Sequence, residues 1–88
     1  GIIMSFFKEI ADKIGRKATG GYNFIDFNGE YVYVEGIGRV LSLDSDKIEL
    51  SVGKNVLCVT GEELEITELE KGSVIIKGRI RGENLIFS

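Results

Sequence analysis

The chain has 88 residues and a formal net charge of −3, with 43% apolar and 28% charged side chains. This composition is typical of one small globular domain and excludes a disordered chain, and no apolar run is long enough for a membrane span. The acidic balance disfavours nonspecific nucleic-acid binding, and the absence of histidine removes the commonest general base and zinc ligand.

The cellular compartment follows from the cysteine content and the first residues. Cys58 is the single cysteine and cannot form an internal disulfide, so nothing favours secretion. The opening Gly1-Ile2-Ile3-Met4 is too short for a signal peptide and has no basic region. Met4 is the only methionine, and we expect it to be the native first residue. The sequence predicts a cytoplasmic protein.

The first predicted element is an amphipathic helix over Ser5–Ile14, with Ser5 as its N-cap. Its apolar face, at helical spacing, comprises Phe6, Phe7, Ile10, Ala11 and Ile14. A helix of about ten residues is marginal alone in water. We therefore expect it to dock on the rest of the chain, on a partner or on a membrane through Phe6, Phe7 and Ile10. Residues 15–21 (GRKATGG) then form a flexible basic linker.

From residue 22 onward apolar residues recur with a period of two, which indicates β-strands. Eight strands are predicted, at 22–27, 31–35, 39–43, 47–52, 56–60, 63–66, 74–80 and 85–87. Turn-forming residues separate them, with Asn28-Gly29 as the strongest hairpin signal and residues 82–84 as either a turn or a bulge. The sequence predicts an all-β fold, a small, mainly antiparallel sandwich or curled sheet with one short N-terminal helix.

Three segments are apolar on both faces of their strands, namely Tyr31–Val34, Val56–Val59 and Val74–Ile76. A chain this short has few places where a strand buries both faces, so either the sheet curls on itself or another surface covers it. We expect self-association through the β region, with Tyr31 and Tyr33 adding interface area. The competing interpretation is that the helix covers the excess apolar face of a monomer.

Apolar residues and glycines stand in a regular pattern along the second half of the chain. Leu57-x-Val59-x-Gly61-x-x-Leu64-x-Ile66-x-x-Leu69 precedes Gly72-x-Val74-x-Ile76-x-Gly78-x-Ile80. Together with Tyr31-Val32-Tyr33-Val34-Glu35-Gly36 and Val40-x-Ser42-x-Asp44-x-x-x-Ile48-x-Leu50, this pattern resembles the YabP/YqfC family of sporulation proteins. The pattern departs from the family near its end, where residues 82–84 lengthen the stretch before Leu85 and Phe87.

The resemblance implies a non-enzymatic protein that is made in the mother cell of a sporulating bacterium and is needed for the spore envelope or coat. It also implies a place in the cytoplasm at the membrane periphery, beside a sporulation membrane protein as partner. On this resemblance, residues 1–21 form an N-terminal helix with its linker, and residues 22–88 form a YabP/YqfC-like β domain.

The search for catalytic, metal-binding and cofactor-binding residues gives none. Gly36-Ile37-Gly38 lacks the third glycine and the following helix of a nucleotide loop, and Asp44-Ser45-Asp46 lacks the spacing of a calcium loop. Cys58 lies mid-strand among apolar residues, so we expect it to be buried and inert. We expect no enzyme activity and no cofactor.

An RNA-binding alternative rests on a basic stripe. Ile80-Arg81-Gly82-Glu83-Asn84-Leu85 is similar to the second motif of Sm-like RNA-binding proteins, and Gly38-x-Val40-x-x-x-Asp44 to part of the first. In this alternative the chain is a subunit of an Sm-like ring, and the resemblance assigns RNA contacts to Asp44, Arg81 and Gly82. However, Lys47 stands where the first motif usually has Asn.

The stripe itself consists of Lys77, Arg79 and Arg81, which share one face of a predicted strand. A hairpin around Lys71-Gly72 would set Glu65 opposite Lys77 and Glu63 opposite Arg79. Such cross-strand pairs would neutralise the stripe. We therefore expect no nucleic-acid partner.

Overall fold

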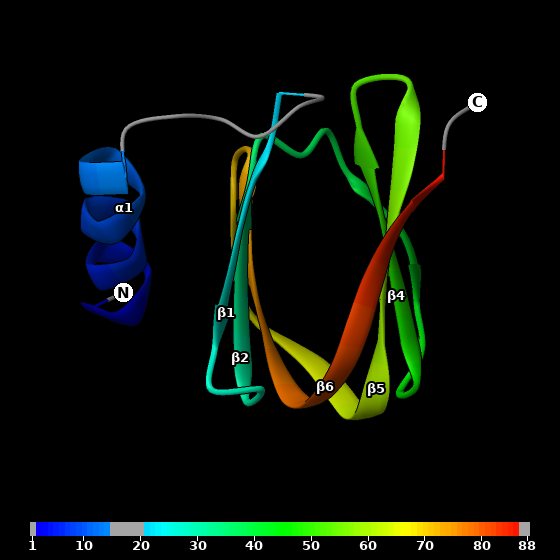
Figure 1. Ribbon diagram of the computed structural model, residues 1–88. Helices are drawn as coiled ribbons and strands as arrows, with labels where there is room; N and C mark the ends of the chain where they lie inside the picture. The colour runs from blue at the N-terminus through cyan, green and yellow to red at the C-terminus, as the bar shows by residue number, and fades with distance from the viewer. Residues whose placement is uncertain (1, 15–20, 87–88) are drawn as a thin grey trace.

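A single antiparallel sheet accounts for most of the chain (Figure 1). The computed structural model describes residues 2–14 and 21–86. Within them lie helix α1 (Ile2–Ile14) and strands β1 (Asn23–Phe27), β2 (Tyr31–Glu35), β3 (Val40–Leu43), β4 (Lys47–Val52), β5 (Asn55–Glu70) and β6 (Ser73–Ile86). The strands are arranged in the order β1-β2-β6-β5-β4-β3. The predicted all-β fold with one N-terminal helix is confirmed.

The sheet curls on itself because β5 and β6 are long and bent. Both strands run from one wall of the molecule, along its base and into the opposite wall (Figure 1). Their bends bring β1 and β2 to face β3 and β4 across an apolar interior. This interior is filled by fully buried aliphatic side chains, among them Val32, Val34, Ile48, Leu50, Val74 and Ile76. The curled form of the predicted sheet is thus the one observed.

Two glycines allow β5 and β6 to approach each other closely at the bend. A Cβ on Gly61 would lie 2.1 Å from the carbonyl oxygen of Arg79, and one on Gly78 would lie 2.8 Å from that of Glu63. Gly78 also has a φ of 154°. Shifts of register along the β5–β6 ladder increase its twist and let both strands bend without breaking.

The continuous bend corrects four predicted strands. Residues 56–60 and 63–66 belong to one strand, β5, and residues 74–80 and 85–86 belong to β6, while Phe87 lies outside the described residues. Residues 82–84 are therefore part of a strand rather than a turn. Glycines and polar residues in these segments resemble strand ends in the sequence, whereas they mark bulges and close contacts inside the strands.

The predicted β5–β6 register is half correct. Glu65 lies opposite Lys77, as expected, but Arg79 lies opposite Glu62 rather than Glu63. The cause is a register shift between Glu62 and Glu65, where Glu63 adopts a left-handed backbone with a φ of 54°. A bulge of this kind shifts the pairing register of the residues beyond it by one position relative to the neighbouring strand.

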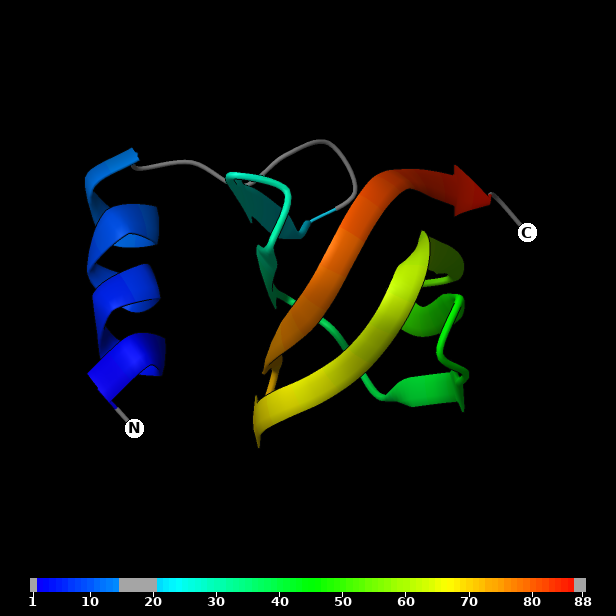
Figure 2. The same ribbon diagram turned by 90° about the horizontal axis from the view of Figure 1, so that it is seen from below.

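Helix α1 covers the outer face of the sheet near β1, β2 and β6 (Figure 2). Met4, Phe7 and Ala11 are buried there against Tyr33 and Ile75. This second core explains why two of the segments are apolar on both faces. It confirms, for this part of the sheet, the interpretation that the helix covers the excess apolar surface.

The helix differs from its prediction in its start and in its buried face. It begins at Ile2 rather than after an N-cap at Ser5. The buried stripe has i, i+3, i+7 spacing from Met4, so Phe6 stays 49% exposed and Ile10 is half-buried. The side chain of Ile14 and the linker at 15–20 lie outside the described residues. The described helix is neither long nor apolar enough to cross a membrane.

Candidate interaction surface

Aromatic rings connect the core beneath the helix with the molecular surface. Tyr33 is fully buried and stacks on Phe7, with ring centroids 5.5 Å apart. Phe7 also makes edge contacts with Phe6 at 5.7 Å and with Phe27 at 6.2 Å. The two outer rings are about half exposed. Their positions are therefore set by rings that are buried.

These outer rings belong to an exposed apolar surface that we call the N-terminal patch. It comprises Ile2, Ile3, Phe6 and Phe27, whose exposed fractions are 90%, 48%, 49% and 50%. Groups of large exposed apolar side chains are characteristic of interaction sites. The patch is thus a surface on which another molecule could bury apolar area.

Polar contacts within the sheet accompany the aromatic rings, and one ion pair joins the helix to the sheet. The hydroxyl of Tyr33 donates a 2.6 Å hydrogen bond to the carboxylate of Glu35 and lies 3.4 Å from the Ser73 hydroxyl. Burial, and then this bond to Glu35, raise the pKa of Tyr33 to about 12. Lys8 of the helix donates a 2.6 Å hydrogen bond to Glu70. This bond raises the pKa of Lys8 and lowers that of Glu70.

The structure brings the five residues predicted for interaction to this one region. Phe6 is half exposed, Ile10 and Tyr31 are half-buried, and Phe7 and Tyr33 are buried against each other. Their contacts with a partner remain a prediction. Ile2, Ile3 and Phe27 were not predicted to take part. For Ile3 the usable signal was an apolar residue one position before each buried position of the helix.

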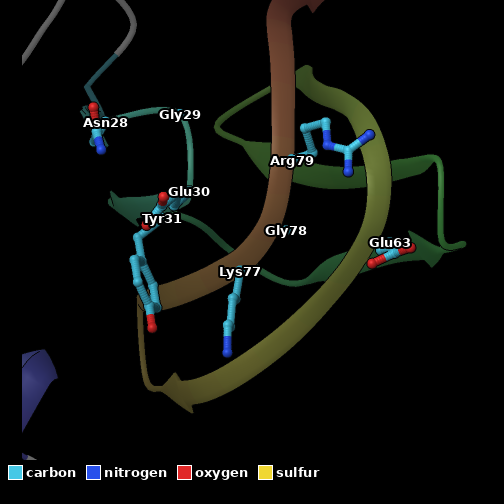
Figure 3. A pocket seen from close by; sticks show the side chains of 8 residues that line it. All are labelled: Asn28, Gly29, Glu30, Tyr31, Glu63, Lys77, Gly78 and Arg79. Carbon is cyan, nitrogen blue, oxygen red and sulfur yellow. The ribbon is translucent and has the colours of Figure 1, made fainter.

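A polar hollow lies between the β1–β2 turn and the bend of β5 and β6 (Figure 3). It is lined by Asn28, Gly29, Glu30, Tyr31, Glu63, Lys77, Gly78 and Arg79. The ammonium of Lys77 lies 6.0 Å from the centroid of the Tyr31 ring, a cation–π distance. Asn28 and Glu63, the non-glycine residues with positive φ among those described, both line it.

The residues that line the hollow include two carboxylates and two cationic side chains but no histidine or cysteine. Across residues 2–14 and 21–86, no group of three or more histidine, cysteine or acidic side chains could hold a metal ion.

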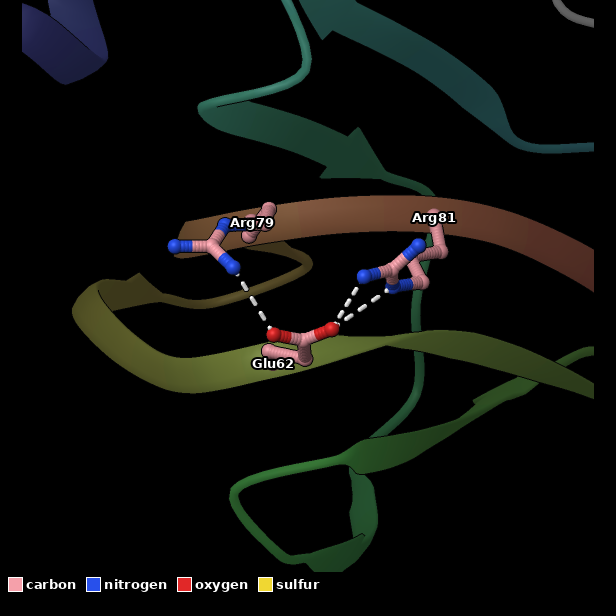
Figure 4. Close-up of polar contacts among 3 residues, drawn as sticks. All are labelled: Glu62, Arg79 and Arg81. Carbon is pink, nitrogen blue, oxygen red and sulfur yellow. Dashed lines mark hydrogen bonds and ion pairs between the residues drawn. The ribbon is translucent and has the colours of Figure 1, made fainter.

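The basic stripe is partly compensated by one carboxylate (Figure 4). Glu62 accepts a 2.9 Å hydrogen bond from Arg79, and it accepts bonds from both Nε and a terminal nitrogen of Arg81. The bond from Arg81, more than that from Arg79, lowers the pKa of Glu62. The two arginine side chains are largely exposed, and Glu62 is about half exposed. The stripe therefore carries less positive potential than its sequence suggests.

The residues of the RNA-binding alternative lie on neighbouring strands. Gly82 pairs with Thr60, which in turn pairs with Lys47 at the start of β4. Asp44 lies in the exposed turn before that strand, while the guanidinium of Arg81 is engaged by Glu62. RNA contacts by these residues remain untested.

Comparison with known proteins gives one result. The model of the YabP family matches residues 25–85, which span the sheet from β1 almost to the end of β6. The match includes Phe27 of the N-terminal patch, whereas α1 precedes it. A search of curated proteins gives no match.

Proposed function

The chain belongs to the YabP family, which is associated with sporulation, and we propose that it acts there as a non-enzymatic interaction protein that helps build the spore envelope or coat. In this role it works by presenting surfaces to other molecules. It acts in the cytoplasm of the mother cell, at the membrane periphery.

The N-terminal patch is the observation that carries the proposal. Its four large apolar side chains lie on α1 and at the end of β1. Phe7 contacts both Phe6 and Phe27 and itself stacks on the buried Tyr33. Transfer of such apolar area from water into an interface lowers the free energy, so the patch favours binding of a partner. The proposed partners are a second copy of the chain and a sporulation membrane protein.

The test uses a sporulating host in which the gene is deleted and then restored. The wild-type gene should restore normal spore envelope and coat layers by electron microscopy, and a gene carrying Phe6→Glu together with Phe27→Glu should not. The matched control is Glu9→Gln with Asp12→Asn, which changes charge on the polar side of the same helix. Immunoblots must show equal protein levels.

Two further results decide the proposal. Affinity capture of the intact protein from sporulating cells should recover a membrane protein that the patch variant fails to recover. Normal spore layers in the deletion strain, or full function of the patch variant, would reject the proposed role.

A further inference from the structure

Helix α1 carries two apolar stripes of identical spacing. Met4, Phe7 and Ala11 form the stripe that is buried on the sheet. Ile3, Phe6 and Ile10 form a second stripe, in which each residue precedes a buried one by one position. One position corresponds to a rotation of about 100° around a helix. The sheet of the same chain cannot cover both stripes, and we call the second one the helix flank.

The helix flank is apolar and firmly positioned. Ile3 is 48% and Phe6 is 49% exposed, and Ile10 is half-buried. The edge contact of Phe6 with Phe7, at a centroid distance of 5.7 Å, continues the buried helix–sheet interface outward. With Ile2 and Phe27, the exposed apolar area is on the order of 500 Å². Two such surfaces would bury about 1,000 Å² together, which reaches the lower range of specific interfaces.

The spacing of the flank makes it complementary to itself. Phe6 lies three residues after Ile3 and four before Ile10, so reversing the helix direction gives nearly the same pattern. Two antiparallel helices would set Phe6 near Phe6 of the second copy and Ile3 near Ile10. Ridges at three- and four-residue spacing interlock in this way in helix pairs. An arrangement in which each copy offers the same patch closes as a two-fold dimer.

The charges on the helix are compatible with this approach. Lys8, Glu9, Asp12 and Lys13 sum to zero, so two copies of α1 meet without net repulsion. An anionic lipid surface is a less suitable occupant, because two of these four charges are carboxylates. We propose that the helix flank is the contact surface of a symmetric dimer of this chain. The inference rests on the self-association included in the proposed function and names its interface.

The first test is a disulfide cross-link across the two-fold axis. A Phe6→Cys variant of the full chain should form a covalent dimer on mild oxidation, because position 6 lies next to itself in the dimer. Ser5→Cys is the matched control, since Ser5 is an exposed neighbour on the polar side. Wild-type protein controls for Cys58, which is buried and should not react. Cross-linking of both variants to the same extent would contradict the interface.

The second test measures molar mass by light scattering. The wild type and Ser5→Glu should have the mass of a dimer, while Phe6→Glu should have that of a monomer with an unchanged circular dichroism spectrum. A wild type that stays monomeric at millimolar concentration would overturn both the interface and self-association, and flotation of this monomer with lipid vesicles would identify lipid as the occupant. If Phe6→Glu still assembles like the wild type, the interface is wrong and self-association stands.

Discussion

Phe7 and Tyr33 stack with an angle of 4° between their rings, so the helix and the sheet meet through two nearly parallel aromatic faces. Phe7 is 3% exposed and Tyr33 is fully buried. Phe7→Ala would leave a cavity above Tyr33, and we expect it to lower the free energy of unfolding by about 3–5 kcal/mol. Urea denaturation followed by circular dichroism measures the loss.

Phe6→Ala is the matched control for this substitution. The Phe6 ring is half exposed, so its truncation should cost about 1 kcal/mol in a monomeric preparation. Equal losses for the two variants would show that α1 is not docked through Phe7.

The hydroxyl of Tyr33 supports a separate prediction. Tyr33→Phe keeps the stack and removes the bonds to Glu35 and Ser73, which should cost about 1 kcal/mol at neutral pH. The folded state raises the pKa of Tyr33 from 10.0 to about 12, so the stability that this group contributes is complete below pH 10 and is lost as the pH rises toward 12. The difference between wild type and variant should therefore shrink above pH 10. A constant difference up to pH 12 would contradict the assignment.

The glycines at the bend should not be interchangeable with alanine. Gly61→Ala places a Cβ 2.1 Å from a backbone oxygen, and Gly78→Ala places one 2.8 Å from another. Both variants should lose about 3 kcal/mol or more, because backbone atoms cannot move aside easily. Gly82→Ala is the control in the same sheet, since its nearest atom is 3.9 Å away. Thermal unfolding compares the three, and a tolerated Gly61→Ala would argue against the close crossing of β5 and β6.

The alternation of apolar residues was enough to predict most of the sheet from sequence. Strands β1, β2, β3 and β4 lie within one residue of their predicted bounds, and Cys58 is buried as expected. Each of these strands ends at a turn with its own local signal, such as Asn28-Gly29. The family resemblance, which is itself a pattern of apolar residues and glycines, was confirmed for the same reason.

The parts that were not predicted depend on contacts between distant residues. Gly61 and Gly78 resemble strand ends locally, and only the approach of β5 to β6 makes them interior positions. The partner of Arg79 moved from Glu63 to Glu62 because a bulge has no clear signature in the sequence. Likewise, the helix stripes that contain Met4 and Phe6 are both apolar and equally spaced, and only contact with Tyr33 selects the one that is buried.

The ion pairs of Glu62 predict weak RNA binding. Wild-type protein should bind U-rich RNA weakly at about 50 mM salt and lose this binding steeply as salt is added. Glu62→Gln removes the charge that compensates Arg79 and Arg81, so this variant should bind more tightly than the wild type at low salt. Fluorescence polarisation measures both.

The same assay tests the RNA-binding alternative. Arg81→Ala is the control and should reduce whatever binding is present. Submicromolar binding of the wild type at physiological salt, abolished by Arg81→Ala, would favour the Sm-like function over the one proposed.

Glu83 supplies the last prediction, which concerns acid pH. Glu83 pairs with Val59 in the β5–β6 ladder, and its side chain is exposed. Partial desolvation, and then the negative charge of Asp26, raise the pKa of Glu83 above 4.5. Protonation of Glu83 thus favours the folded state.

The sign of the pH dependence follows from the raised pKa. The stability due to protonated Glu83 is complete below its unfolded pKa and is lost as the pH rises through the higher folded pKa. Glu83→Gln keeps a neutral side chain at every pH, so it should be more stable than the wild type at pH 7 and equal to it at about pH 3. Urea denaturation at both pH values measures this, with Glu9→Gln on the exposed helix surface as control. A variant that is less stable at pH 7, or that gains equally at both pH values, would show that Glu83 ionises without cost in the folded protein.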